Sequence, residues 1–116
     1  MTRKAVVQKE PLVAPGRAVR ALTHQLDELQ KLKNRNYQEA EAEETEWEHL
    51  TQGLIETAFG DPRPILDKFY IAGASGEHIL GNVSLQQRQI NFELRVREYD
   101  ALLRGLIGVL RLQLPG

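Results

Sequence analysis

Residues 84–112 read SLQQRQINFELRVREYDALLRGLIGVLRL, and their pattern sets the architecture expected for the whole chain. Apolar side chains recur at alternating spacings of three and four residues, which places them on one face of an α-helix. Ser84 followed by Gln87 forms a capping-box pattern, so the helix is predicted to begin after Ser84 and to continue to about Leu112. The heptad positions are Leu85, Phe92, Val96, Tyr99, Leu103, Leu106 and Leu110, with Gln89 at the one position that is not apolar.

The last turns of this helix carry more apolar surface than one neighbouring helix covers. Besides the heptad stripe, they contain Leu102, Ile107, Val109 and Leu112. Two shorter helices of the same chain, a second copy of the chain, or another domain could cover this surplus. We expect self-association, with a dimer favoured, or docking of a partner domain. The predicted interface consists of Phe92, Val96, Tyr99, Leu103, Leu106 and Leu110.

Two further helices are predicted in the first half of the chain. An apolar stripe over residues 17–33 predicts the first of them, and its members are Val19, Leu22, Leu26 and Leu29. Asn36 with Glu39 fits a capping-box variant and predicts the start of the second helix, which the run Gly60-Asp61-Pro62 ends. Its predicted apolar face contains Trp47, Leu50, Leu54 and Ala58, and Trp47 is expected to be a core residue.

The fold predicted from these patterns is mainly α, a compact bundle of three principal helices over residues 17–114. Residues 1–16 have little hydrophobic periodicity and are predicted to form a mobile N-terminal arm. The segment 65–83 leaves two alternatives open. Its apolar pieces 68–72 and 78–80 suit a small β-hairpin, while an ordered loop that packs on the helices fits equally well.

The glycines between the second and third predicted helices suggest a second class of function. Gly73, Ser75 and Gly76 could offer backbone amides to an anion, and Arg88 follows near the start of the last helix. The alternative function is therefore a small-ligand or nucleotide-binding protein that uses the loop at 73–82.

Composition excludes several classes of partner and site. The chain has 15 Lys and Arg against 16 Asp and Glu, a net charge of −1, which removes the general argument for nucleic acid or anionic membrane binding. There is no cysteine, and therefore no disulfide or thiolate nucleophile. No apolar run is long enough to span a membrane, and no signal-peptide core precedes the first helix. We expect a soluble, cytoplasmic protein.

The charge is nevertheless segregated along the chain. Residues 1–35 contain eight basic and three acidic residues (+5), 36–62 contain eight acidic and no Lys or Arg (−8), and 63–116 contain seven basic and five acidic (+2). This distribution favours pairing of the first segment with the second, within one chain or between two copies.

Catalytic and metal patterns are weak in this sequence. His24, His49 and His78 lie far apart, and no nucleophile-and-base motif occurs. Glu46 and His49 share a helix face, as in di-metal bundles, but such sites need a second pair and further carboxylates. We therefore predict no enzyme activity, no metal site and no cofactor.

The order of these elements resembles a known group of bacterial domains. A leucine-striped helix is followed by a helix that carries Trp47 and ends at Ala58-Phe59-Gly60, then by Phe69, and then by a long helix with Leu102, Leu106 and Leu110. This order, over about residues 18–114, resembles the helical N-terminal modules that precede Toll/interleukin-receptor-like and predicted nucleotide-binding effector domains of bacterial antiphage systems. The resemblance implies an adaptor or oligomerisation role in defence or signalling.

Overall fold

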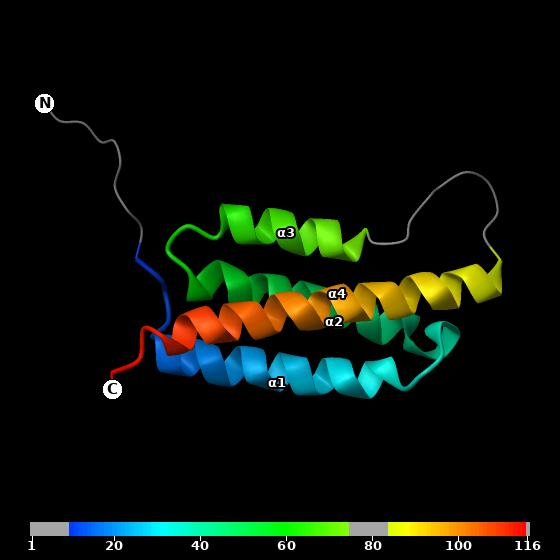
Figure 1. The fold of residues 1–116 in the computed structure, drawn as a ribbon, viewed down its shortest axis with the longest axis horizontal. Coiled ribbons are helices and arrows are strands. Elements are labelled where there is room, and N and C mark those ends of the chain that lie inside the picture. Colours follow the sequence, from blue (N-terminus) through cyan, green and yellow to red (C-terminus); the bar gives the residue numbers. More distant parts are fainter. Residues whose placement is uncertain (1–9, 75–83, 116) are drawn as a thin grey trace, which may run out of the picture.

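The computed structural model describes residues 10–74 and 84–115, and these form four α-helices (Figure 1). In chain order the helices are α1 (Pro15–Lys33), α2 (Tyr37–Ala58), α3 (Arg63–Gly73) and α4 (Leu85–Arg111). None of the described residues forms a β-strand. The prediction of a mainly helical fold is therefore confirmed, but with a fourth helix.

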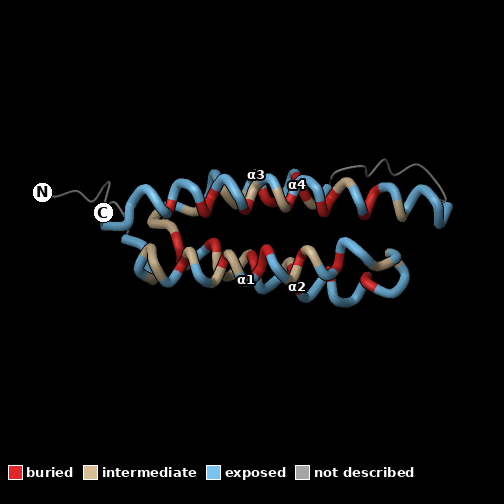
Figure 2. The backbone as a smooth tube through the Cα atoms, turned by 60° about the horizontal axis from the view of Figure 1, so that its bottom comes forward, coloured by how far each residue is buried: buried red, intermediate tan, exposed pale blue. Residues whose placement is uncertain are grey.

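The long helix α4 is the central element of the bundle. It packs most extensively on α1 and also on α3, whereas its backbone approaches α2 less closely. In Figure 1, α4 lies in front of α2, with α1 below it and α3 above it. Figure 2 shows the same arrangement as two layers, α1 beside α2 and α3 beside α4. Among the described helices, none has both the length and the apolar character that crossing a membrane requires.

The core follows the predicted helix stripes. On α1 the buried positions include Leu22, Leu26 and Leu29, and on α2 they include Trp47 and Ala58. Trp47 is 4% exposed, so its prediction as a core residue is confirmed. Leu50 was predicted to share this face, but it is 58% exposed, because it lies to one side of the stripe formed by Trp47, Thr51, Ile55 and Ala58.

Side-chain caps fix the beginnings of two helices. The amide of Glu39 donates to the Asn36 side chain at 3.0 Å, and the amide of Gln87 donates to the Ser84 hydroxyl at 3.0 Å. These contacts satisfy first-turn amides that have no partner inside the helix. Both predicted N-caps are confirmed.

The segment between α2 and α4 corrects the sequence-based prediction. Residues 68–72, predicted as a strand or as part of a loop, lie within helix α3. Pro64 sits at the second position of this helix, where a missing amide hydrogen costs nothing, and Phe69 and Ala72 form its buried face. The other half of the predicted hairpin, 78–80, lies outside the described residues.

Residues 10–16, the described part of the predicted N-terminal arm, belong to the folded bundle. Helix α1 begins at Pro15, and the amides of Leu12 and Val13 both donate to the carbonyl oxygen of Thr57, at 2.9 and 3.2 Å. Val13 packs against the core. Residues 10–14 are thus held against the end of α2, while residues 1–9 lie outside the described part of the chain.

Candidate functional site

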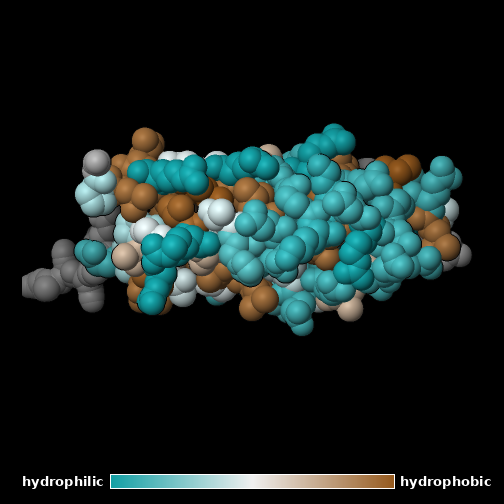
Figure 3. Space-filling model, turned by 90° about the horizontal axis from the view of Figure 1, so that it is seen from below, coloured by the Kyte–Doolittle hydropathy of each residue, from teal (hydrophilic) through white to brown (hydrophobic). Residues whose placement is uncertain are grey.

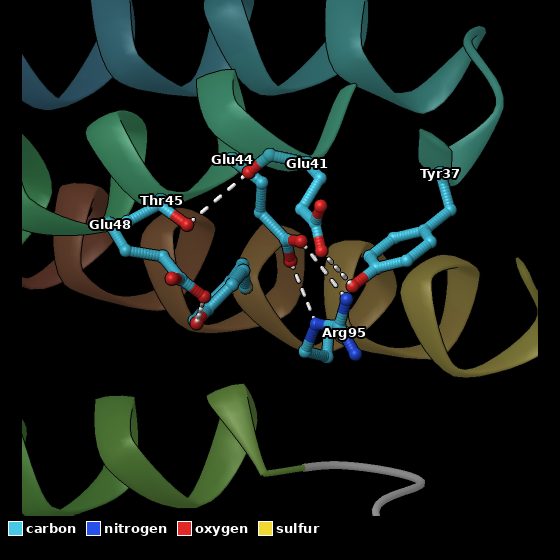
Figure 4. Close-up of polar contacts among 7 residues, drawn as sticks. Tyr37, Glu41, Glu44, Thr45, Glu48 and Arg95 are labelled. Atoms are coloured by element: carbon cyan, nitrogen blue, oxygen red, sulfur yellow. Dashed lines mark hydrogen bonds and ion pairs between the residues drawn. The ribbon is translucent and has the colours of Figure 1, made fainter. Parts of the chain in front are cut away.

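Polar side chains bridge α2 and α4 inside the bundle, where the two backbones do not pack closely (Figure 4). Glu44 and Arg95 form a bidentate ion pair, in which Nε and Nη2 of Arg95 donate to the two carboxylate oxygens at 2.8 and 2.9 Å. Glu44 is 5% exposed and Arg95 is 9% exposed. Both charges are therefore desolvated, and each depends on the other for compensation.

Tyr37 covers the guanidinium group from the N-terminal end of α2. Its ring centre lies 5.8 Å from Cζ of Arg95, within the range of a cation–π contact, and its hydroxyl donates to Glu41 at 2.6 Å. Burial acts to lower the pKa of Arg95, but the hydrogen bonds and charge of Glu44 outweigh it, so that the pKa is raised. Arg95 is therefore charged under all ordinary conditions.

One turn further along α2, Glu48 accepts a hydrogen bond from the hydroxyl of Tyr99 on α4. Burial raises the pKa of Glu48, while the hydrogen bond from Tyr99 acts in the opposite direction. Tyr99 also packs between Trp47 and Phe69, with ring centres 5.0 and 4.9 Å away. This aromatic cluster fixes the tyrosine ring and directs its hydroxyl toward the carboxylate.

Trp47 is held in turn by a buried contact with α1. Its indole Nε1 donates to the backbone oxygen of Gln25 at 2.8 Å, and the side chain of Gln25 donates to Thr51 at 2.9 Å. Because both contacts join α1 to α2, they set the position from which Trp47 reaches the aromatic cluster.

A pocket of about 460 Å³ opens beside Glu48, between α2, α3 and α4. Helix α2 contributes Glu48, His49 and Gln52 to its lining, and α4 contributes Tyr99. The α3 side is formed by Leu66, Phe69, Tyr70 and Gly73. A Cβ atom at position 73 would lie 2.5 Å from the Tyr99 hydroxyl oxygen, so glycine there is what allows α3 to approach the Glu48–Tyr99 contact.

The six predicted interface residues all lie in the core of the single chain. Phe92, Val96, Tyr99, Leu103, Leu106 and Leu110 are between 0% and 8% exposed. The other helices of the same chain cover them, which was one of the alternatives that the pattern allowed. A contact surface for a second folded chain therefore has to be built from other residues.

The predicted ligand residues are only partly brought to one place. Gly73 lines the pocket, but Arg88 lies exposed in the first turn of α4 and does not line it. Ser75 and Gly76 lie outside the described residues. His49 lines the pocket, but it belongs to no group of three or more candidate metal-ligating residues among those described.

Glu44, Glu48 and Arg95 were not predicted as site residues. Glu44 lies three residues before Trp47, and Arg95 is directly followed by Val96, so both charges fall within buried helix faces. A charged residue inside an apolar stripe is the one sequence feature that could have indicated them. The predicted pairing of the basic segment 1–35 with the acidic segment 36–62 is represented by a surface ion pair, in which Nη1 of Arg35 lies 2.5 Å from Oε1 of Glu43.

Comparison of the chain with protein-family models, curated proteins and solved structures finds no match.

Proposed function

We propose that the chain is a non-enzymatic protein-interaction module that self-associates through the outer face of α4. The observation that carries this proposal is a pair of glycines, Gly105 and Gly108, on the exposed side of that helix. A Cβ atom at either position would have no neighbouring atom within 4 Å among the described residues. Packing within the chain therefore does not require glycine at these positions.

The glycines belong to a second stripe on α4, opposite the core. An α-helix turns by about 100° per residue, which places Ala101, Gly105 and Gly108 on the side of α4 that faces away from Tyr99, Leu103 and Leu110. The stripe continues to Leu112 at the end of the helix. Figure 1 shows this helix in front of the bundle, with no described element in front of it.

Glycine inside a helix lowers stability by about 1 kcal/mol relative to alanine. The two exposed glycines therefore destabilise α4, although packing among the described residues does not require them. Small residues on a helix face allow a second backbone to approach closely, and this would give the glycines a structural use. The same face in a second copy would form a symmetric contact.

Exposed apolar side chains near the stripe support the same proposal. Val109 is 50% exposed and Leu112 is 86% exposed. Figure 3 views the molecule from the α1 side, where the surface is mostly hydrophilic and hydrophobic residues show mainly toward the two ends. Arg97, Glu98 and Arg104 add charges of both signs along the stripe, as the polar rim of an interface requires.

We extend the proposal to a role in a bacterial defence or signalling effector, for which the resemblance in helix order is the support. The Trp47 helix with its Ala58-Phe59-Gly60 end, Phe69 and the leucines of α4 carry that resemblance. Co-purification of the chain with an effector protein encoded next to it would test this part.

The test of self-association is the molar mass by light scattering after size-exclusion chromatography, over a wide range of protein concentrations. We expect a dimer for the unmodified chain. Gly108→Gln should give a folded monomer, because glutamine favours the helix but occupies the space that a second backbone needs. Ala42→Gln, at an exposed small residue of α2, is the matched control and should leave the dimer intact.

A chain that is monomeric at every concentration would overturn the proposal. So would a Gly108→Gln variant that remains dimeric. Circular dichroism of both variants distinguishes a lost contact from lost folding.

A further inference from the structure

The pocket between α2, α3 and α4 lies on the opposite side of α4 from the glycine stripe, and it has a chemistry of its own. Of the described residues that line it, none is Lys or Arg, and Glu48 is the one acidic residue. Arg95, the nearby cation of α4, is committed to Glu44 by two hydrogen bonds. The pocket therefore presents a negative charge that no lining arginine or lysine neutralises.

This charge argues against the anionic ligand suggested by the glycines around position 73. A phosphate placed against Gly73 would enter a pocket that contains the Glu48 carboxylate, in a partly desolvated setting where like charges repel strongly. The negative charge of Glu48 favours a cationic ligand instead.

The carboxylate retains the capacity to bind one. A carboxylate offers about four lone-pair sites, and the Tyr99 hydroxyl occupies one of those on Glu48. Tyr99 is fixed by the aromatic cluster, and it therefore orients the carboxylate without neutralising it.

The remaining walls suit an apolar group attached to that cation. Leu66 and Phe69 line the α3 side, and Tyr70, which is 75% exposed, also belongs to the lining. Aromatic faces attract cations as well as apolar groups. A volume of about 460 Å³ is within the usual range for small-molecule pockets.

We propose that this pocket binds a small organic cation, an amine attached to an aromatic or aliphatic group, with its ammonium on Glu48 and its apolar part against Leu66, Phe69 and Tyr70. This site is independent of the α4 surface and of the proposed function.

The raised pKa of Glu48 gives the site a second measurable property. Burial and the charge of Glu44 favour the protonated carboxyl, while Tyr99, Arg95 and His49 favour the ionised form. A bound cation also favours the ionised carboxylate and therefore lowers the pKa of Glu48. Binding should therefore release protons at a pH near the raised pKa, and affinity should fall as Glu48 becomes protonated.

The experiment is isothermal titration calorimetry of the full chain with phenethylamine. Two probes of similar shape serve as controls, neutral 2-phenylethanol and anionic 3-phenylpropionate. We expect saturable binding of the amine and much weaker binding of both controls. Titration in two buffers with different ionisation enthalpies measures the protons released.

Glu48→Gln should weaken amine binding by roughly ten- to a hundredfold, the loss expected for one charge-assisted hydrogen bond. Glu46→Gln removes the same charge from an exposed position of α2 and should leave binding unchanged. The proposal is overturned if phenethylamine does not bind, if the alcohol or the acid binds equally well, or if folded Glu48→Gln retains full affinity.

Discussion

Removal of the Arg95 guanidinium should destabilise the domain more than any surface substitution. Glu44 is 5% exposed in the unmodified chain, and Arg95→Met removes the two hydrogen bonds at 2.8 and 2.9 Å that its carboxylate accepts. An uncompensated buried charge of this kind costs about 3–5 kcal/mol. A domain of this size has a free energy of unfolding of about 5–15 kcal/mol, so the loss is a large part of the total.

The double variant separates the cost of an unpaired charge from the value of the pair. Glu44→Met combined with Arg95→Met leaves no buried charge and fills the space with flexible apolar side chains. Its stability should return to within about 1–2 kcal/mol of the unmodified chain, because replacing a buried pair by apolar residues is often close to neutral. The single variants should therefore be strongly non-additive.

Urea unfolding followed by far-ultraviolet circular dichroism measures all four members of this cycle. The surface pair Lys31 and Glu28, 2.8 Å apart with side chains 73% and 38% exposed, supplies the control. Lys31→Met should change stability by less than about 0.5 kcal/mol. A loss below about 1 kcal/mol for Arg95→Met, or a double variant as unstable as the sum of the singles, would contradict the role assigned to the buried pair.

Four other substitutions test separate features of the chain. Gly73→Ala should cost about 1–3 kcal/mol, since its Cβ would lie 2.5 Å from the Tyr99 hydroxyl, whereas Gly53→Ala, with open space around it, should stabilise α2 by up to about 1 kcal/mol; urea unfolding measures both. Thr23→Val should be neutral or raise the melting temperature, because the Thr23 hydroxyl is buried without a hydrogen-bond partner among the described residues; a clear drop would contradict this. Burial raises the pKa of Glu48, so this carboxyl binds its proton more tightly in the folded chain, and stability falls as the pH rises through the interval above the ordinary carboxyl pKa. Glu48→Gln should remove that part of the pH dependence of stability. If the free energies of unfolding of variant and parent differ by the same amount at acid and at neutral pH, the prediction is wrong.

Helix α1 could be predicted from its apolar stripe, and α2 and α4 because their sequences agree at several levels. Apolar periodicity, an Asn36 or Ser84 cap and a stop at Gly60 all indicate the same boundaries. The short helix α3 lacks that agreement, because aromatic and β-branched residues at 69–71 are typical of strands. Its helical form depends on tertiary contacts, above all on Phe69 packing against Trp47 and Tyr99.

The partners of buried side chains were harder to predict than their burial. The heptad stripe of α4 indicates a buried face, but a periodic pattern does not say whether the covering helices belong to the same chain. Glu44 and Arg95 are separated by 51 residues, and the structure alone brings them together. Glu48 and Tyr99 are likewise separated by 51 residues, and the need for glycine at position 73 comes from the approach of α3 to their contact, a long-range feature with no local pattern.

The spacing of α2 and α4 links the buried polar pairs to the pocket. The backbones of α2 and α4 do not pack closely, so long side chains connect the two helices. The connecting pairs are Glu44–Arg95 and Glu48–Tyr99. Helix α3 packs beside the Glu48–Tyr99 contact and contributes Leu66 and Phe69 to the lining. The pocket therefore lies where α2 and α4 are connected by side chains and not by close packing of their backbones. Tyr99 is on the core side of α4, while Gly105 and Gly108 are on the opposite side. Glu48→Gln should therefore change amine binding without altering the molar mass, and Gly108→Gln should do the reverse.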